Sequence, residues 1–363
     1  MKRTYKTWAA ALACAGIISW GAMPAQALDL GIWGTLAGAA IYYHQLDSTL
    51  NHYDTDGREE FFEGLKKKNG VDYDQTKNAM LDAVMSRLSY TVSLSEPSIV
   101  ERPYLYFINP SQDFNAFCSL GHTMSVNSGV FPILNYNENE IAFVIAHEMV
   151  HGQKNHVVQG MRKSFPMEVL QAVYGSQNGG SLGVDILANY ASAVYVTKSQ
   201  EKEADKIAFD YAVGAGYNPG GGAALWQRII EKMGDNPSTF VGELFAPSDH
   251  PENGERRDEY AKRLKEFSKG HVTVKDGVVS VGKTAWITAG STDAMSGAER
   301  SYLIAGNLAA AFHNQGRESW RAYVGTDGYV YMGSQPICLP NGGEPGAYAL
   351  AAQLDQLLAG LGN

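Results

Sequence analysis

Residues 137–156 read NENEIAFVIAHEMVHGQKNH, and the interpretation of the whole chain starts from this stretch. The run Ile141 to Ala146 is apolar, which is typical of a buried helix. An H-E-x-x-H motif follows it. His147 and His151 are four residues apart and share one helix face, so they can supply two protein ligands of a catalytic zinc ion. Glu148 is offset around the helix, where it suits a general base.

The motif alone leaves an alternative, a helix that carries two surface histidines. That alternative puts two polar rings on an apolar helix without partners, which is unfavourable. The start of the helix has its own signal. Asn137 fits an N-cap, and Glu140 three residues later fits a capping box.

A second pair of residues favours the zinc site. Glu201 and Asp205 are also four residues apart, on a second predicted helix. Glu201 is the predicted third ligand, and Asp205 is predicted to accept the far N–H of a ligand histidine and fix its tautomer. Glu203 and its two lysine neighbours are assigned to a solvated face. The spacing predicts one Zn²⁺ per chain.

Five motifs together resemble one family. They are HEMVH (147–151), EKEAD (201–205), NAFCSLG (115–121), AGYNP (215–219) and SDHP (248–251) with Arg256. The chain resembles the HtpX- and BepA-like zinc metallopeptidases, the CaaX-prenyl-protease-like class of peptidase family M48, over about residues 75 to 267. Asp249 stands where the family usually has threonine.

The resemblance implies a zinc-dependent endopeptidase with a gluzincin fold. It maps the zinc ligands onto His147, His151 and Glu201, and the base onto Glu148. It also implies that His250 approaches the zinc and closes the site, or stabilises the oxyanion. The alternative for His250 is an ordinary loop residue. For Arg256 a structural salt bridge is expected.

The charge of the chain and its N-terminal residues limit the possible partners and location. The 363 residues carry a net charge of −9 and have no large basic cluster, so no nucleic-acid partner is expected. Residues 1–27 have a basic start, an apolar core and an A-Q-A site, which predicts a signal peptide cleaved after Ala27 and export to the periplasm or cell envelope.

Residues 28–70 are predicted to form an apolar helix and a polar linker. The apolar run is shorter than a membrane span of roughly 20 residues. It therefore predicts a core or interfacial helix, with peripheral membrane or envelope-protein contact.

Two further features surround the zinc helix. Residues 103–130 predict strands with a hairpin at Gly121. One of them is our candidate for an edge strand that holds substrate by strand addition, with an ordinary core hairpin as the alternative. Its residues are His122, Thr123, Met124, Ser125 and Val126.

Cys118 and Cys338 remain after export, and they form either a disulfide or two separate buried thiols.

The tail contains an internal repeat. Residues 274–282 and 325–333 share the pattern D-G-x-V-x-x-G, a hairpin signal, and helices are predicted at about 298–312 and 346–360. Two ββα-like units would form an accessory domain at 271–363, whose partner is unknown.

The fold class is α+β, with a mainly helical gluzincin metallopeptidase domain and a small β-sheet at 71–268.

The predicted function is that of an exported endopeptidase acting on proteins or peptides, in envelope protein quality control. The alternative is a zinc-bound, chaperone-like protein that binds clients with little proteolysis. Glu148 favours catalysis, because a site that only binds has no need of a base.

Overall fold

The structure is a computed structural model that describes residues 32–166, 184–185, 187–188, 196–235 and 252–361. The chain divides into two compact parts, residues 1–43 and residues 44–363, and the fold described below is that of the second part. The predicted signal peptide lies outside the described residues, as do His250 and the rest of the 248–251 motif. None of the helices in the described ranges combines the length and the apolar character that a membrane crossing requires.

The polar part of the segment 28–70, predicted to be a linker, is helical. Helix α1 (Ile32–Asp54) continues into it, and α2 (Arg58–Asn69) fills the rest. The reason is burial. Leu50, Phe61 and Leu65 are each 0% exposed, so the few apolar residues of this polar segment form the buried faces of two amphipathic helices.

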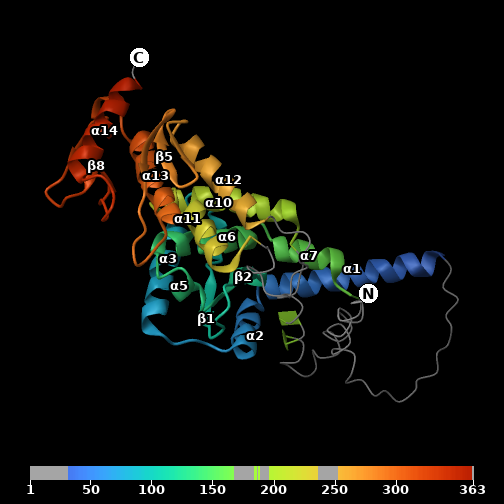
Figure 1. Cartoon of the computed structure of the whole chain (residues 1–363). Helices are drawn as coiled ribbons and strands as arrows, with labels where there is room; N and C mark the ends of the chain where they lie inside the picture. Colours follow the sequence, from blue (N-terminus) through green and yellow to red (C-terminus); the bar gives the residue numbers. More distant parts are fainter. Residues whose placement is uncertain (1–31, 167–183, 186, 189–195, 236–251, 362–363) are drawn as a thin grey trace, which may run out of the picture. The chain divides into compact units, whose positions relative to one another are not determined.

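Helix α6 (Glu138–Gln153) lies in the middle of the first core, with almost every residue buried. It packs against α3 (Gln75–Ser93), α10 (Lys198–Gly214), α11 (Gly221–Met233) and a small sheet, as Figure 1 shows. The remaining elements of this part are α4 (Ser98–Glu101), α5 (Val130–Ile133), α7 (His156–Ser164) and α12 (Asn253–Phe267). The apolar helix predicted around the H-E-x-x-H motif is therefore present, although it ends at Gln153 and a new helix follows.

The small sheet has the strand order β1-β3-β2. Strand β1 (Leu105–Asn109) is parallel to β3 (Thr123–Asn127), and β2 (Ala116–Ser119) is antiparallel to β3. The hairpin predicted at Gly121 is present, and Gly121 has φ 65°, a conformation that favours glycine. However, β3 is the central strand, and both its edges are paired. The prediction that His122 to Val126 form a substrate-binding edge strand is therefore wrong, and the edge strand beside α6 is β2.

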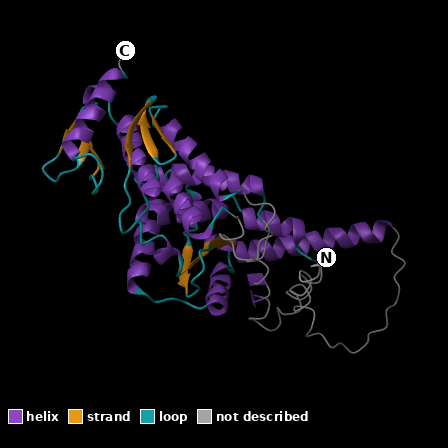
Figure 2. Cartoon of the chain, viewed as in Figure 1, coloured by secondary structure: helices purple, strands orange, loops and turns teal. Residues whose placement is uncertain are grey.

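The tail contains two similar units, each a three-stranded antiparallel sheet followed by a helix (Figure 2). The first has β4 (Val272–Lys275), β5 (Val278–Val281), β6 (Thr284–Thr288) and α13 (Gly297–Asn314). The second has β7 (Ala322–Val324), β8 (Val330–Met332), β9 (Gln335–Cys338) and α14 (Ala347–Gly360). Both predicted hairpins and both helices are present. The predicted ββα order lacked the third strand, which follows a second turn at Gly282 in one unit and Gly333 in the other.

The two units share one hydrophobic core. Helix α13 contacts β9 of the other unit, and α14 contacts β6, so each helix packs on both sheets. Of the two alternatives for Cys118 and Cys338, the structure has two separate thiols, both of them free and buried. They belong to different hydrophobic cores, because Cys118 lies in the core around α6 and Cys338 in the core of the tail.

A buried cluster of one arginine and two glutamates connects α6, α11 and α13. Arg228 Nε donates to Glu140 Oε2 at 2.8 Å, and the Arg228 guanidinium also contacts Glu299. All three side chains are less than 5% exposed. The reciprocal capping box predicted with Glu140 is not formed: Asn137 Oδ1 accepts from the Asn139 N–H, and the Glu140 carboxylate accepts from the Asn137 side-chain amide and from Arg228, not from the Asn137 backbone N–H. Breaking a buried pair of this kind is costly, since the remaining charge stays buried.

We expect Glu299→Gln to change how stability depends on pH. Burial and the nearby Glu140 carboxylate raise the pKa of Glu299 to about 9. A carboxyl whose folded pKa is raised stabilises the fold below its unfolded pKa of 4.5, and this contribution is lost as the pH rises towards 9. Glutamine keeps a donor and an acceptor but does not ionise. The stability of the variant relative to wild type should rise by at most about 1.4 kcal/mol per pH unit in this window.

Urea unfolding at pH 5.5, 7 and 8.5 measures the effect. Glu138→Gln, on the exposed first turn of α6, is the control. Parallel pH profiles for Glu299→Gln and wild type would contradict the predicted effect of Glu299.

Candidate active site

Helix α6 presents three chemically active side chains inside the protein. His147, Glu148 and His151 are 3%, 5% and 5% exposed. The helix begins at the Asn137 cap, and its register places both histidines on the face towards α10. The polar rings are therefore not on a solvated surface, and the alternative of two surface histidines is wrong.

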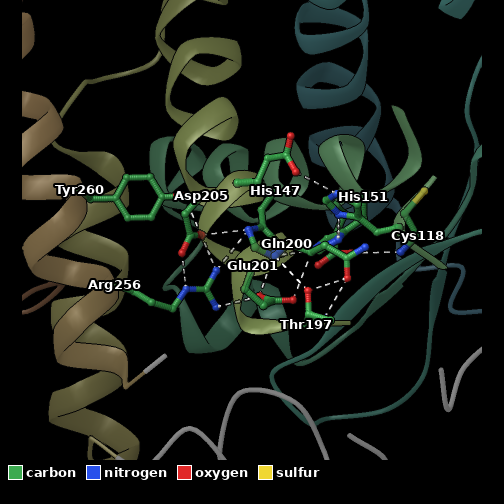
Figure 3. A network of polar contacts seen from close by, with 12 residues as sticks. Cys118, His147, His151, Thr197, Gln200, Glu201, Asp205, Arg256 and Tyr260 are labelled. Atoms are coloured by element: carbon green, nitrogen blue, oxygen red, sulfur yellow. Dashed lines mark hydrogen bonds and ion pairs between the residues drawn. The ribbon is translucent and has the colours of Figure 1, made fainter. Parts of the chain in front are cut away.

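The first turn of α10 supplies the third member of the group. Thr197 forms a capping box with Gln200: the Gln200 N–H donates to Thr197 Oγ1, and the Thr197 N–H donates to Gln200 Oε1. This box sets the start of the helix and places Glu201 at its N-terminal end, where a carboxylate is favoured by the helix dipole. Figure 3 shows Glu201 lying below His147, with Thr197 and Gln200 beside it.

The three side chains converge on one point. His147 Nε2 and His151 Nε2 are 2.9 Å apart, and they lie 3.4 Å and 3.5 Å from the two Glu201 carboxylate oxygens. This buried group could hold a metal ion. Two imidazoles and one carboxylate, with no further protein ligand among the described residues, are the donor set of a catalytic zinc site.

The charges around this point also fit a divalent cation. Glu148, Glu201 and Asp205 are all buried, and Arg256 is the cation that faces them. When both histidines are neutral, as zinc ligation requires, Glu201 and Asp205 outnumber the Arg256 guanidinium and leave an excess of negative charge. Such an excess is unfavourable in a buried site unless a cation compensates it.

Asp205 orients the first histidine. Its Oδ1 lies 2.9 Å from His147 Nδ1, the contact that the sequence predicted. Arg256 Nε donates to Asp205 Oδ2 at 2.6 Å, the Tyr260 hydroxyl donates to Asp205 Oδ1 at 3.1 Å, and the guanidinium stacks over the Trp226 ring. Figure 3 shows Arg256 reaching from α12 between Asp205 and Glu201. The structural salt bridge expected of Arg256 is confirmed.

The buried environment shifts the pKa of each group. Burial lowers the pKa of His151 to about 3. Burial also favours neutral His147, but the Asp205 carboxylate outweighs it and raises the pKa of His147 to about 9. Burial raises the pKa of Glu148 to about 7, despite the neighbouring His147. For Glu201, burial is outweighed by its contact with His147, which lowers the pKa.

Strand β2 approaches Glu148 directly. The Cys118 N–H donates to Glu148 Oε2 at 3.0 Å, so this N–H points away from β3 and towards the site. The close approach depends on Gly152, because a Cβ there would lie 2.8 Å from Cys118 Sγ and from the Tyr104 hydroxyl. The backbone of an edge strand therefore positions the carboxylate.

One residue of the site was missed in the sequence. His156 is 1% exposed, and its Nδ1 lies 2.8 Å from His151 Nδ1. Glu203, assigned to a solvated face, is half exposed but its carboxylate reaches 3.4 Å from His156 Nε2. A third histidine five residues after the motif was the available signal. In a continuous helix it would point about 140° away from His151, so helical spacing gave no reason to select it.

The comparison with family models decides the family. The model of peptidase family M48 matches residues 75–264, which is more than half of the chain. The chain belongs to peptidase family M48. The matched range contains α6, α10 and most of α12, and it includes all of the residues that converge on the site.

Individual relatives agree with the M48 assignment. Metalloprotease LoiP of Escherichia coli is 27% identical over 184 residues, which cover 49% of this chain and 69% of LoiP. The β-barrel assembly-enhancing protease of Escherichia coli is 24% identical over 150 residues, covering 38% and 31%. Mitochondrial metalloendopeptidase OMA1 of Arabidopsis thaliana is 30% identical over 149 residues, covering 39% and 28%.

M48 membership and the buried His-His-Glu group establish the class of enzyme. The chain is a zinc-dependent metalloendopeptidase, and its substrates are proteins or peptides. The fold class is the predicted one, α+β and mainly helical, with small three-stranded sheets. The tail beyond residue 264 lies outside the family match.

Proposed function

We propose that the protein is an exported endopeptidase that cleaves misfolded or unassembled envelope proteins, with zinc held by His147, His151 and Glu201 and with Glu148 as the base. The observation that carries the proposal is the convergence of these two histidines and one carboxylate beside a buried, separately positioned glutamate. Zinc, when bound, supplies Lewis acidity, which polarises a carbonyl and acidifies water.

The residues of the chain have distinct tasks in this proposal. Glu148 removes the proton of the attacking water at its carboxylate and returns it to the amine that leaves. One carboxylate thus acts as general base and then as general acid. Asp205 and Arg256 hold His147, so that its Nε2 lone pair faces the ligand position. Asp205 stabilises the protonated imidazolium form of His147. Since zinc binds neutral imidazole, its binding would displace the Nε2 proton and leave the Nδ1 proton hydrogen-bonded to Asp205.

The edge of the sheet that faces Glu148 is β2, not β3. An extended substrate that pairs with β2 would lie alongside the base, and strand addition is a common way to hold a peptide backbone. Because the Cys118 N–H already binds Glu148, it also keeps the carboxylate close to that edge. This supports β2 as the substrate-binding strand.

Two features support a role in the envelope. The first is the signal-peptide pattern of residues 1–27. The second is the relative named a β-barrel assembly-enhancing protease. The chaperone-like alternative is not favoured, because burial and a backbone hydrogen bond position a glutamate that client binding alone does not use.

Metal removal tests the proposed function. We expect a zinc chelator to abolish cleavage of unfolded casein and stoichiometric Zn²⁺ to restore it, whereas Mg²⁺ and Ca²⁺ should not, because they prefer all-oxygen sites. Cleavage is measured on gels, together with the zinc content of the protein. Full activity in a zinc-free protein would contradict the proposal. Binding of unfolded casein without cleavage, at one zinc per chain, would instead favour the chaperone-like alternative.

A further inference from the structure

His151 is bonded on the side away from the proposed zinc position. Its Nε2 faces His147 and Glu201, and its Nδ1 lies 2.8 Å from His156 Nδ1. The other ring nitrogen of His156, Nε2, lies 3.4 Å from the Glu203 carboxylate. The two histidines therefore form a chain that runs from the ligand position to an acid at the surface.

The direction of the proton in the His151–His156 contact follows from ligand chemistry. A neutral imidazole that binds metal through Nε2 must carry its proton on Nδ1. His151 Nδ1–H is then the donor and His156 Nδ1 is the acceptor. Neutral His156 carries its own proton on Nε2, the nitrogen that faces Glu203. The reverse direction would leave the proton of His151 on the nitrogen that must bind zinc.

The backbone is built to make this contact. Lys154 and Asn155 interrupt the helices α6 and α7, and Asn155 has φ 52° and ψ 37°, in the left-handed region. Asparagine enters this region more readily than most residues. The break turns the chain back, so that His156, the first residue of α7, packs against His151 instead of pointing away from it. His156 is thereby sealed inside at 1% exposure.

We propose that His156 and Glu203 form a positioning relay for the second zinc ligand, in which the His156 Nδ1 lone pair fixes the tautomer and the orientation of His151. His156 does not touch substrate, so it is a positioning residue. The relay is the counterpart of the Asp205–Arg256 pair behind His147. The two ligand histidines are thus held by different groups, a carboxylate for His147 and a neutral imidazole for His151. This inference rests on the proposed zinc site.

The test uses two side chains that place an acceptor differently. The amide of asparagine can put an oxygen near the position of His156 Nδ1, whereas the amide of glutamine reaches the position of Nε2. We expect His156→Asn to bind zinc within about threefold of wild type. His156→Gln and His156→Leu should bind about 10- to 100-fold more weakly, the range found for partners of metal-ligating histidines. Zinc affinity is measured by competition with a chromophoric chelator at constant pH.

A second pair of variants tests the acid. Glu203→Ala should weaken zinc binding by about tenfold. Asp210→Ala is the matched control, since Asp210 is another exposed acid on α10, paired with Arg263 and away from the relay. The visible spectrum of the cobalt-substituted protein gives a readout of ligand geometry. We expect it to change in His156→Leu and to stay as in wild type in His156→Asn.

The outcomes separate the relay from packing. If affinity follows side-chain volume, with glutamine and leucine better than asparagine, His156 only fills space and the relay is wrong. Equal affinity in all His156 variants and wild type would also overturn it. If His156→Leu does not fold, the comparison of asparagine with glutamine decides alone. A wild-type protein that binds no zinc would overturn the proposed function as well, whereas zinc binding indifferent to His156 overturns the relay alone.

Discussion

Glu148→Gln is expected to keep its zinc and its fold and to lose casein cleavage by about three orders of magnitude. Glutamine has nearly the same shape and can still accept the Cys118 N–H through its amide oxygen, so the contact between α6 and β2 is retained. It cannot accept a proton from water. General-base catalysis contributes about 10²- to 10⁴-fold, which sets the size of the loss.

The measurement is the rate of casein cleavage at equal zinc content. Glu138→Gln is the matched control, because Glu138 lies on the same helix but in the exposed first turn, where it pairs with Arg87. Residual activity above about a tenth of wild type in Glu148→Gln would exclude Glu148 as the base.

Glu201→Gln should lower zinc affinity by more than about a hundredfold, beyond the range found for groups that only support a ligand. The carboxylate is the charged member of the ligand group and lies within 3.5 Å of both imidazole Nε2 atoms. Glutamine retains one weak oxygen donor but removes the negative charge that a buried divalent cation needs.

Elemental analysis of the purified variant, followed by chelator competition, gives the result. Glu255→Gln is the control: Glu255 also faces the first turn of α10, but it lies at the surface and pairs with Lys198 and Lys202. A Glu201→Gln protein with undiminished zinc content would rule out Glu201 as a ligand. Loss of zinc in both variants would point to the net charge of the region instead.

In the tail, the sequence repeat predicted the hairpins but not the third strands or the contacts between the two units. Asp276-Gly277 and Asp327-Gly328 marked two hairpins correctly, since glycine at positive φ is a local requirement of such turns. The third strand of each unit had no such mark. The exchange of contacts, with α13 on β9 and α14 on β6, depends on pairings between residues far apart in the chain. The domain boundary between residues 268 and 271 stays a prediction. Tyr302 of α13 lies on the far side of that boundary in the sequence but packs in the core around α6.

The sequence by itself determined the features that depend on spacing along one element. His147, His151, Glu201 and Asp205 were selected because residues four apart share a helix face, and the structure brings them together. The range matched by the family model includes all four. The roles of these four residues stay predictions until the variants are measured.

The tertiary structure alone decided which elements are neighbours. It placed β3 at the centre of its sheet and β2 at the edge, and it put Cys118 and Cys338 into separate cores. It also buried Glu140 against Arg228 and turned His156 back onto His151. None of these follows from local spacing, because strand order, core membership and the partner of a buried charge are settled by long-range packing, in which all contacts are satisfied together.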